Sequence, residues 1–115
     1  MGYYTYYKLS VVNEEDFTKE QLQDAASRLA KRLDYDGEIP TSDPFAWLGN
    51  ESMKWYDHEE DLMRLSDEYP DMVFFLEGWG EEFDDVWRKY FKNGAFKSYH
   101  RHYYWDPVPE WLMRS

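Results

Sequence analysis

The sequence predicts a single α+β domain in which two helices cover one face of a mostly antiparallel sheet. Three observations support this fold class: apolar residues alternate near the N-terminus, two later segments repeat them with helical spacing, and an Asn-Gly turn signal separates two aromatic strands near the C-terminus. The chain has 115 residues, 43% of them hydrophobic, which is enough for one core. We expect the domain to span residues 1–105 and a proline-containing C-terminal tail to span residues 106–115.

The first strand and the first helix carry clear local patterns. Residues 3–12 alternate and are rich in Tyr, Thr and Val, which is typical of a strand. One face of this strand would carry Thr5, Tyr7, Leu9 and Val11. Thr18 followed by Gln21 forms a capping-box sequence that starts a helix. The apolar stripe of this helix consists of Leu22, Ala25, Ala26, Leu29 and Leu33. We expect Asp36-Gly37 to end it.

The middle of the chain alternates between a loop, a short strand and a second helix. Residues 38–51 contain two prolines and a glycine, which indicates a loop, and its apolar side chains would pin it to the core. These side chains are Ile39, Phe45, Trp47 and Leu48. We expect a short second strand over residues 52–56. Asp57, with Glu60 three positions later, would then cap a helix that runs to about Tyr69.

The last third of the domain is predicted to be three strands. Residues 72–78 form a near-continuous apolar run that is typical of a central strand, and Gly78-Trp79-Gly80 would break or bulge it. Residues 85–92 and 95–105 flank Asn93-Gly94, which predicts a hairpin with a type I′ turn. The resulting order is strand, helix, strand, helix and three further strands. A ferredoxin-like arrangement is the most economical fold with this order.

The net charge of −11 is concentrated in one segment. Residues 57–85 hold twelve acids and one base, and the rest of the chain is neutral in sum. Residues 86–105 hold five bases, no acid and eight aromatic side chains. An acidic segment therefore runs directly into a basic, aromatic one, and this separation makes both segments candidate binding surfaces.

Several segments resemble known small proteins. Residues 1–5, 53–59 and 86–94 look like small phage and mobile-element proteins. The central part, residues 54–75 together with residues 87–94, resembles the YubB-type ferredoxin-like domain. The resemblance implies a phage-like source and the strand and helix layout given above, and that family has no established catalytic motif. Small acidic phage proteins include many inhibitors of host defence, among them anti-CRISPR proteins and DNA mimics, so a role of that class is implied by analogy.

The residues carry no recognised catalytic or cofactor motif. Cysteine is absent, and no phosphate loop or nucleophile motif occurs. His100 and His102 share one strand face without an identifiable third ligand, so an aromatic, basic surface is favoured over a metal site. His58 follows a helix cap and is expected to face solvent. The longest apolar run, residues 72–76, is far shorter than a membrane span. We expect a cytoplasmic, non-enzymatic protein without cofactor or metal.

Two candidate binding surfaces follow from the charge pattern. The first would engage a host protein with a basic surface, which fits inhibition of a host defence protein. Its residues are Asp57, Glu59, Glu60, Asp61, Glu81, Glu82, Asp84, Asp85 and Trp79. The alternative surface is the basic, aromatic hairpin 86–105, which would bind a nucleic acid or nucleotide by stacking. Its residues are Trp87, Arg88, Lys89, Tyr90, Tyr99, Arg101 and Tyr103.

The net charge disfavours the nucleic-acid surface, because affinity for nucleic acid depends on a dominating positive field. A further interpretation stays open for the acidic segment, since many exposed acids serve only to keep a protein soluble. Oligomeric state is not predicted by any of these patterns.

Overall fold

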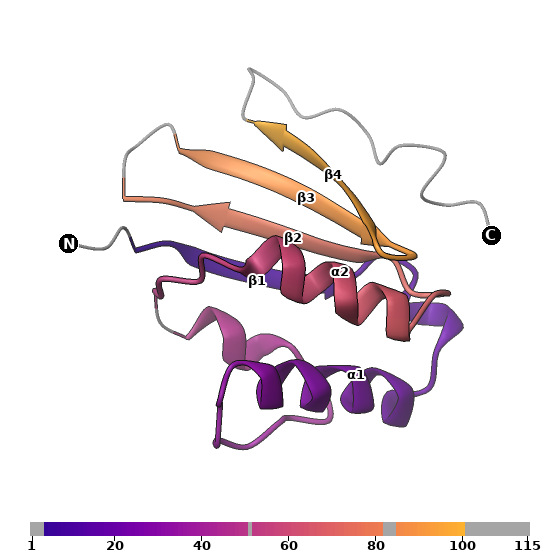
Figure 1. Cartoon of the computed structure of the whole chain (residues 1–115). Helices are drawn as coiled ribbons and strands as arrows, with labels where there is room; N and C mark the ends of the chain where they lie inside the picture. Colours follow the sequence, from indigo (N-terminus) through magenta and orange to yellow (C-terminus); the bar gives the residue numbers. More distant parts are fainter. Residues whose placement is uncertain (1–3, 51, 82–84, 101–115) are drawn as a thin grey trace.

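The computed structural model describes residues 4–50, 52–81 and 85–100 of the chain. Within them, one antiparallel sheet has the strand order β1-β2-β3-β4, and two helices lie on one face of it (Figure 1). The elements are β1 (Tyr6–Val11), η1 (Glu14–Asp16), α1 (Lys19–Arg32), η2 (Ala46–Gly49), α2 (His58–Glu68), β2 (Phe74–Trp79), β3 (Val86–Lys92) and β4 (Ala95–His100). The predicted α+β class with helices on one face of an antiparallel sheet is therefore confirmed.

The first strand alternates as its sequence predicts. Tyr7, Leu9 and Val11 are buried beneath the helices, whereas Tyr6 and Lys8 are exposed on the opposite face. The hydrophobic core lies between this inner face of the sheet and the two helices. Its largest fully buried side chains include Phe74, Phe91, Leu29, Leu62, Leu65 and Leu76.

The first helix begins where the capping box predicts and ends earlier than expected. The Thr18 side chain accepts a hydrogen bond from the Gln21 backbone N–H, and the Gln21 side chain accepts one from the Thr18 backbone N–H. The helix ends at Arg32, not at Asp36-Gly37. Asp34 adopts a left-handed backbone conformation with φ of 55°, which the short polar Asp side chain tolerates and which stops the helix.

The loop is pinned to the core as predicted, but the second strand is wrong. Phe45, Trp47 and Leu48 are buried, so this apolar loop closes one side of the core. Residues 52–56 contribute only one antiparallel bridge, between Thr5 and Met53. The backbone leaves the sheet after this bridge because Trp55 turns into the core and the chain enters α2.

The second helix packs as predicted but starts with different capping chemistry. Leu62 and Leu65 face the core. Asp57 occupies the N-cap position, yet its side chain accepts no capping hydrogen bond, because its backbone is not in the extended conformation that a cap requires. Near the end of the helix, the buried Ser66 hydroxyl accepts a hydrogen bond from the Gly94 backbone N–H and so ties the helix to the hairpin turn.

The predicted break at Gly78-Trp79-Gly80 comes later than its first glycine, because β2 continues through Gly78 and Trp79 and ends before Gly80. Gly78 pairs with Tyr7 on one side and with Trp87 on the other. A β-carbon at Gly78 would lie 2.2 Å from a carbon of the Trp87 ring. The glycine therefore lets the indole lie flat against the strand, which is one of the established uses of glycine within a sheet.

The hairpin turn is confirmed as type I′. Asn93 and Gly94 have φ angles of 52° and 77°, which are the two positive values that this turn requires. Strands β3 and β4 pair from Trp87 opposite His100 to Lys92 opposite Ala95. Residues 101–105 of the predicted second strand lie outside the described residues.

The order of elements is β-α-α-β-β-β when the Met53 bridge is not counted as a strand. Counting the bridge restores the predicted alternation of strand, helix, strand, helix and three strands. The ferredoxin-like order is β-α-β-β-α-β, and such an arrangement stays a prediction. Among the described residues, no helix has both the length and the apolar character that a membrane crossing would need.

We expect Gly78→Ala to lower the free energy of unfolding by about 2 kcal/mol, because the added methyl group would overlap the Trp87 ring. Urea unfolding would measure this. A double-mutant cycle with Trp87→Leu serves as the control, since the cost should largely disappear once the ring is gone. An equal cost in both backgrounds would show that the close approach is not the reason for the glycine.

Candidate partner-binding site

The two oppositely charged segments of the sequence meet inside the structure. Lys89 points from β3 towards α2 and is 9% exposed. Its Nζ lies 2.8 Å from a carboxylate oxygen of Glu59 and 4.3 Å from the centre of the Trp87 ring. An ammonium group next to a carboxylate and over an indole face is stabilised by both. A base of the hairpin therefore binds an acid of the acidic segment.

His58 completes the surroundings of Lys89. Its Nδ1 lies 2.8 Å from the Trp55 carbonyl oxygen, and its Nε2 lies 2.6 Å from the Lys89 Nζ. A carbonyl only accepts and an ammonium group only donates, so Nδ1 carries the proton and Nε2 accepts. The His58 ring stacks on the Trp87 ring, with 5.0 Å between the ring centres. The prediction that His58 faces solvent is wrong, because the helix turns its first residue towards the sheet.

Burial is the main cause that lowers the pKa of His58. The hydrogen bond to the Trp55 carbonyl opposes it, the positive charge of Lys89 lowers the pKa further, and Glu59 and Asp61 oppose it slightly. The imidazole is therefore neutral near pH 7 and acts as a hydrogen-bond acceptor for Lys89. Its geometry stabilises the docking of α2. It offers no free basic nitrogen for catalysis.

An aromatic cluster surrounds this pair. Tyr7 makes edge contacts with Trp55 at 5.3 Å and with Trp87 at 6.0 Å, and its hydroxyl donates to the Trp55 carbonyl. The Trp55 indole N–H donates to Asp61 at 2.8 Å. The predicted binding residues Glu59 and Asp61 therefore have structural partners within the protein.

Other acids of the acidic segment also pair internally. Glu60 forms an ion pair with Arg64 one helical turn away, and Glu77 lies opposite Arg88 on the neighbouring strand. Glu68 bridges to two arginines of α1, at positions 28 and 32. Glu68 thus links α2 to α1, Glu59 links α2 to β3, and all these pairs leave less charge for a partner.

Three of the predicted acids lie together at one end of the sheet. Asp57 is exposed just before α2. Glu81 follows β2 and accepts a hydrogen bond from the Tyr4 backbone N–H at 2.7 Å. Asp85 comes just before β3, and its backbone carbonyl accepts a hydrogen bond from the Gly80 N–H at 2.8 Å, which places it beside Glu81. Glu82 and Asp84 lie outside the described residues.

Exposed aromatic side chains gather at the same end. The large hydrophobic side chains that stand exposed in the described part of the chain are Tyr4, Tyr6, Tyr56 and Trp79. Tyr6 pairs with Trp79 across β1 and β2, and the Lys54 ammonium lies 4.9 Å from the Tyr4 ring centre. Tyr56 follows Trp55, whose buried ring makes an edge contact with the Tyr7 ring at 5.3 Å between ring centres.

We call this surface the aromatic–acidic end. It consists of Tyr4, Tyr6, Tyr56, Asp57, Trp79, Glu81 and Asp85. The sequence pointed to four of these residues. It missed the three tyrosines, although the polar face of an alternating first strand was the signal that could have found Tyr4 and Tyr6.

The structure divides the described residues of the alternative hairpin surface between the two faces of the sheet, and Tyr90 and Tyr99 make an edge contact at 5.9 Å between ring centres on the face away from the helices. Trp87 and Lys89 face the helices, and both are buried. Arg88, Tyr90 and Tyr99 lie on the opposite face of the sheet, where Tyr90 stacks on Phe75 and is itself buried, and Arg88 pairs with Glu77. The remaining two residues of this surface, Arg101 and Tyr103, lie outside the described residues.

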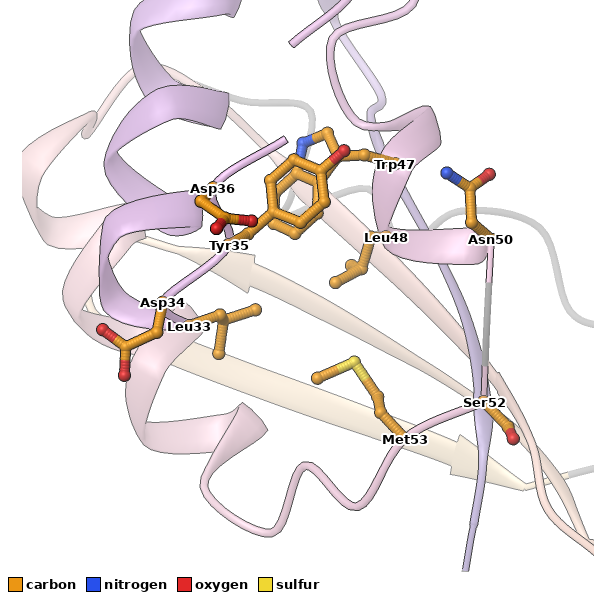
Figure 2. A pocket seen from close by; sticks show the side chains of 9 residues that line it. All are labelled: Leu33, Asp34, Tyr35, Asp36, Trp47, Leu48, Asn50, Ser52 and Met53. Carbon is orange, nitrogen blue, oxygen red and sulfur yellow. The ribbon is translucent and has the colours of Figure 1, made fainter. Parts of the chain in front are cut away.

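A separate cavity of about 410 Å³ lies between the end of α1 and η2 (Figure 2). Tyr35 stacks on Trp47 at 4.4 Å, and Leu33, Leu48 and Met53 form an apolar floor in the view of Figure 2. The buried Nε1–H of Trp47 has no acceptor within the described part of the chain. This arrangement shows how the loop packs, and no side chain there forms a catalytic pair.

No group of three His, Asp or Glu side chains with the spacing of a metal site occurs among the described residues. No protein-family model, no curated protein and no solved structure matches the chain.

The His58–Lys89 contact makes stability depend on pH. Because the folded-state pKa of His58 lies below 6.5, the unfolded chain binds more protons in the interval between these two values. The contribution of His58 is complete above pH 6.5 and is lost as the pH falls through this interval. We expect the free energy of unfolding, measured by urea titration at pH 7.5 and 5.5, to decrease with acidification.

The matched variant is His58→Gln, which can still accept a hydrogen bond from Lys89 but does not titrate. We expect its pH dependence between pH 7.5 and 5.5 to be smaller than that of the wild type. Equal pH dependence in both proteins would contradict the assigned role of His58.

Proposed function

We propose that the protein is a non-enzymatic binding protein that recognises a basic surface of a partner protein through the aromatic–acidic end. One observation carries the proposal: the large aromatic side chains that stand exposed in the described part of the chain lie at the same end of the sheet as Asp57, Glu81 and Asp85. Exposed aromatic residues beside acids are unusual on a surface that serves solubility alone.

The two kinds of residue would have different tasks in binding. Aromatic side chains bury a large area at low entropic cost, and they dominate binding energy in protein interfaces. Tyr56 is 70% exposed, so most of its surface is available to a partner. The acids would steer a basic partner towards this end and exclude acidic ones. Both features are needed for a specific complex.

The resemblance to small phage proteins supports a more specific use. An acidic protein can occupy a basic groove in place of phosphates, and the target would then be a host defence protein that binds nucleic acid. The same resemblance supports a cytoplasmic location in a host cell and a ferredoxin-like relationship of the fold. These points belong to the proposal and rest on the sequence.

We expect the triple variant Asp57→Lys, Glu81→Lys and Asp85→Lys to lose its partner. With the tagged protein as bait in a host lysate, mass spectrometry would identify the partner, and the variant should bind it at least about tenfold more weakly. The charge-matched control is Glu15→Lys, Asp36→Lys and Glu38→Lys, which changes net charge equally at exposed positions away from this end. Equal loss in both variants would mean that only total charge matters.

A second variant tests the aromatic contribution without a change of charge. Tyr56→Ala should weaken partner binding about tenfold or more, as hot-spot residues do, with little change in the free energy of unfolding because the side chain is exposed. Unchanged capture by this variant and by the triple variant would contradict the proposal. Salt-dependent binding of single-stranded oligonucleotides, without a protein partner, would favour the nucleic-acid alternative.

A further inference from the structure

The outer edge of β1 presents backbone groups that the described chain does not pair. Thr5 exchanges two hydrogen bonds with Met53 at this edge, whereas the Val12 N–H binds the Val73 carbonyl on the β2 side. Successive residues of a strand point their N–H and C=O groups to opposite edges. Tyr7, Leu9 and Val11 therefore point theirs outwards, as Thr5 does.

Met53 pairs only with Thr5, the first residue whose backbone groups point outwards from this edge. The described backbone forms no further bridge along this edge, and no backbone hydrogen bond from the outward N–H groups occurs within the described residues. The loop comes nearest at Gly49, where a β-carbon would lie 3.1 Å from the Tyr7 carbonyl oxygen. Leu9 is the next residue along β1 whose backbone N–H and C=O groups point outwards. Backbone N–H and C=O groups without a partner in the chain need a hydrogen bond with water or with another chain.

A groove of about 640 Å³ runs along the same edge. Its lining includes Tyr6, Leu9 and Ser10 of β1, together with Glu14 of η1, Asp43 of the loop and Ala46 of η2. Trp79, a residue of the aromatic–acidic end, also lines it. The groove is therefore continuous with the proposed binding surface.

The charges around the groove favour a basic occupant. Glu14 and Asp43 are both exposed, and Lys8 is the one base among the described lining residues. Lys8 pairs in register with Glu77 of β2. A second copy of the chain would bring another net charge of −11 and its own two acids to the same edge, and like charges repel. An extended basic segment has neither disadvantage.

We propose that the outer edge of β1 binds an extended, basic segment of the partner by strand addition, with its backbone paired to Leu9 and its basic side chains beside Glu14 and Asp43. This inference rests on the proposed function, because it names how a basic partner would continue from the aromatic–acidic end. Strand addition supplies affinity through backbone hydrogen bonds and specificity through alternate side chains. Lys8 and the packing of η2 against β1 protect part of this edge, and β1 carries no proline, so we place the pairing at Leu9, where the described backbone forms no bridge.

The test uses an acetylated and amidated hexapeptide of alternating Lys and Val. We expect it to bind the full chain and to slow hydrogen exchange of the Leu9 amide at least about tenfold at saturation, as a new ladder hydrogen bond does. The same peptide with alternate backbone nitrogens methylated should not bind, because the hydrogen-bond donors are gone. A Glu-Val hexapeptide should not bind either, because it would face two carboxylates.

Matched variants test the charges. Glu14→Lys with Asp43→Lys should weaken the Lys-Val peptide about fivefold or more, whereas Glu15→Lys with Glu38→Lys, which lie outside the groove lining, should change affinity less than about twofold. Both variants carry the same net charge. Isothermal titration calorimetry would measure the affinities, and equal weakening would overturn the assignment of Glu14 and Asp43.

The other outcomes are equally decisive. Absence of binding, or equal binding of the methylated peptide, would overturn strand addition, and equal binding of the Glu-Val peptide would overturn the basic chemistry. If protection of the Leu9 amide rises with protein concentration in the absence of peptide, the occupant of the edge would be a second copy of the chain and not the partner. If the peptide fails while the triple variant of the aromatic–acidic end still loses its partner, the groove proposal falls and the proposed function stands.

Discussion

The contact between Lys89 and the start of α2 is the interaction on which the surface depends. Lys89 meets His58 and Glu59 on the helix and Trp87 on its own sheet, so one buried side chain joins the two layers. It also fixes the path of the residues just before the helix. Tyr56 and Asp57 are therefore held at the end of the sheet beside β1 and β2, and the exposed surface is a consequence of the contacts of the buried Lys89 side chain.

The same contact changes the meaning of the charge pattern. In the sequence, an acidic segment and a basic segment look like two separate binding surfaces. In the structure they pair with each other at Lys89 and Glu59 and at Arg88 and Glu77. What remains for a partner is smaller and more aromatic than the whole acidic segment, and its composition resembles that of an interface centre more than that of a solubilising surface.

The sequence was a good guide where local chemistry decides the structure. The capping box at Thr18, the alternation of β1 and the turn at Asn93-Gly94 depend on neighbouring residues, and all three are confirmed. The sequence was a poor guide where the structure depends on contacts between residues that are far apart in the chain. Gly78 continues its strand because of a ring on the next strand, and His58 turns inwards because Lys89 lies 31 positions later. No pattern within a short window carries that information.

The most direct test of the account is hydrogen exchange of the captured complex, compared with that of the free protein. If the aromatic–acidic end is the interface, residues 4–6, 54–57 and 79–81 should become protected on binding, while α1 should not change. Protection confined to the β3 and β4 amides around Tyr90 and Tyr99, with no change at these three segments, would contradict the central claim and would assign binding to the hairpin instead.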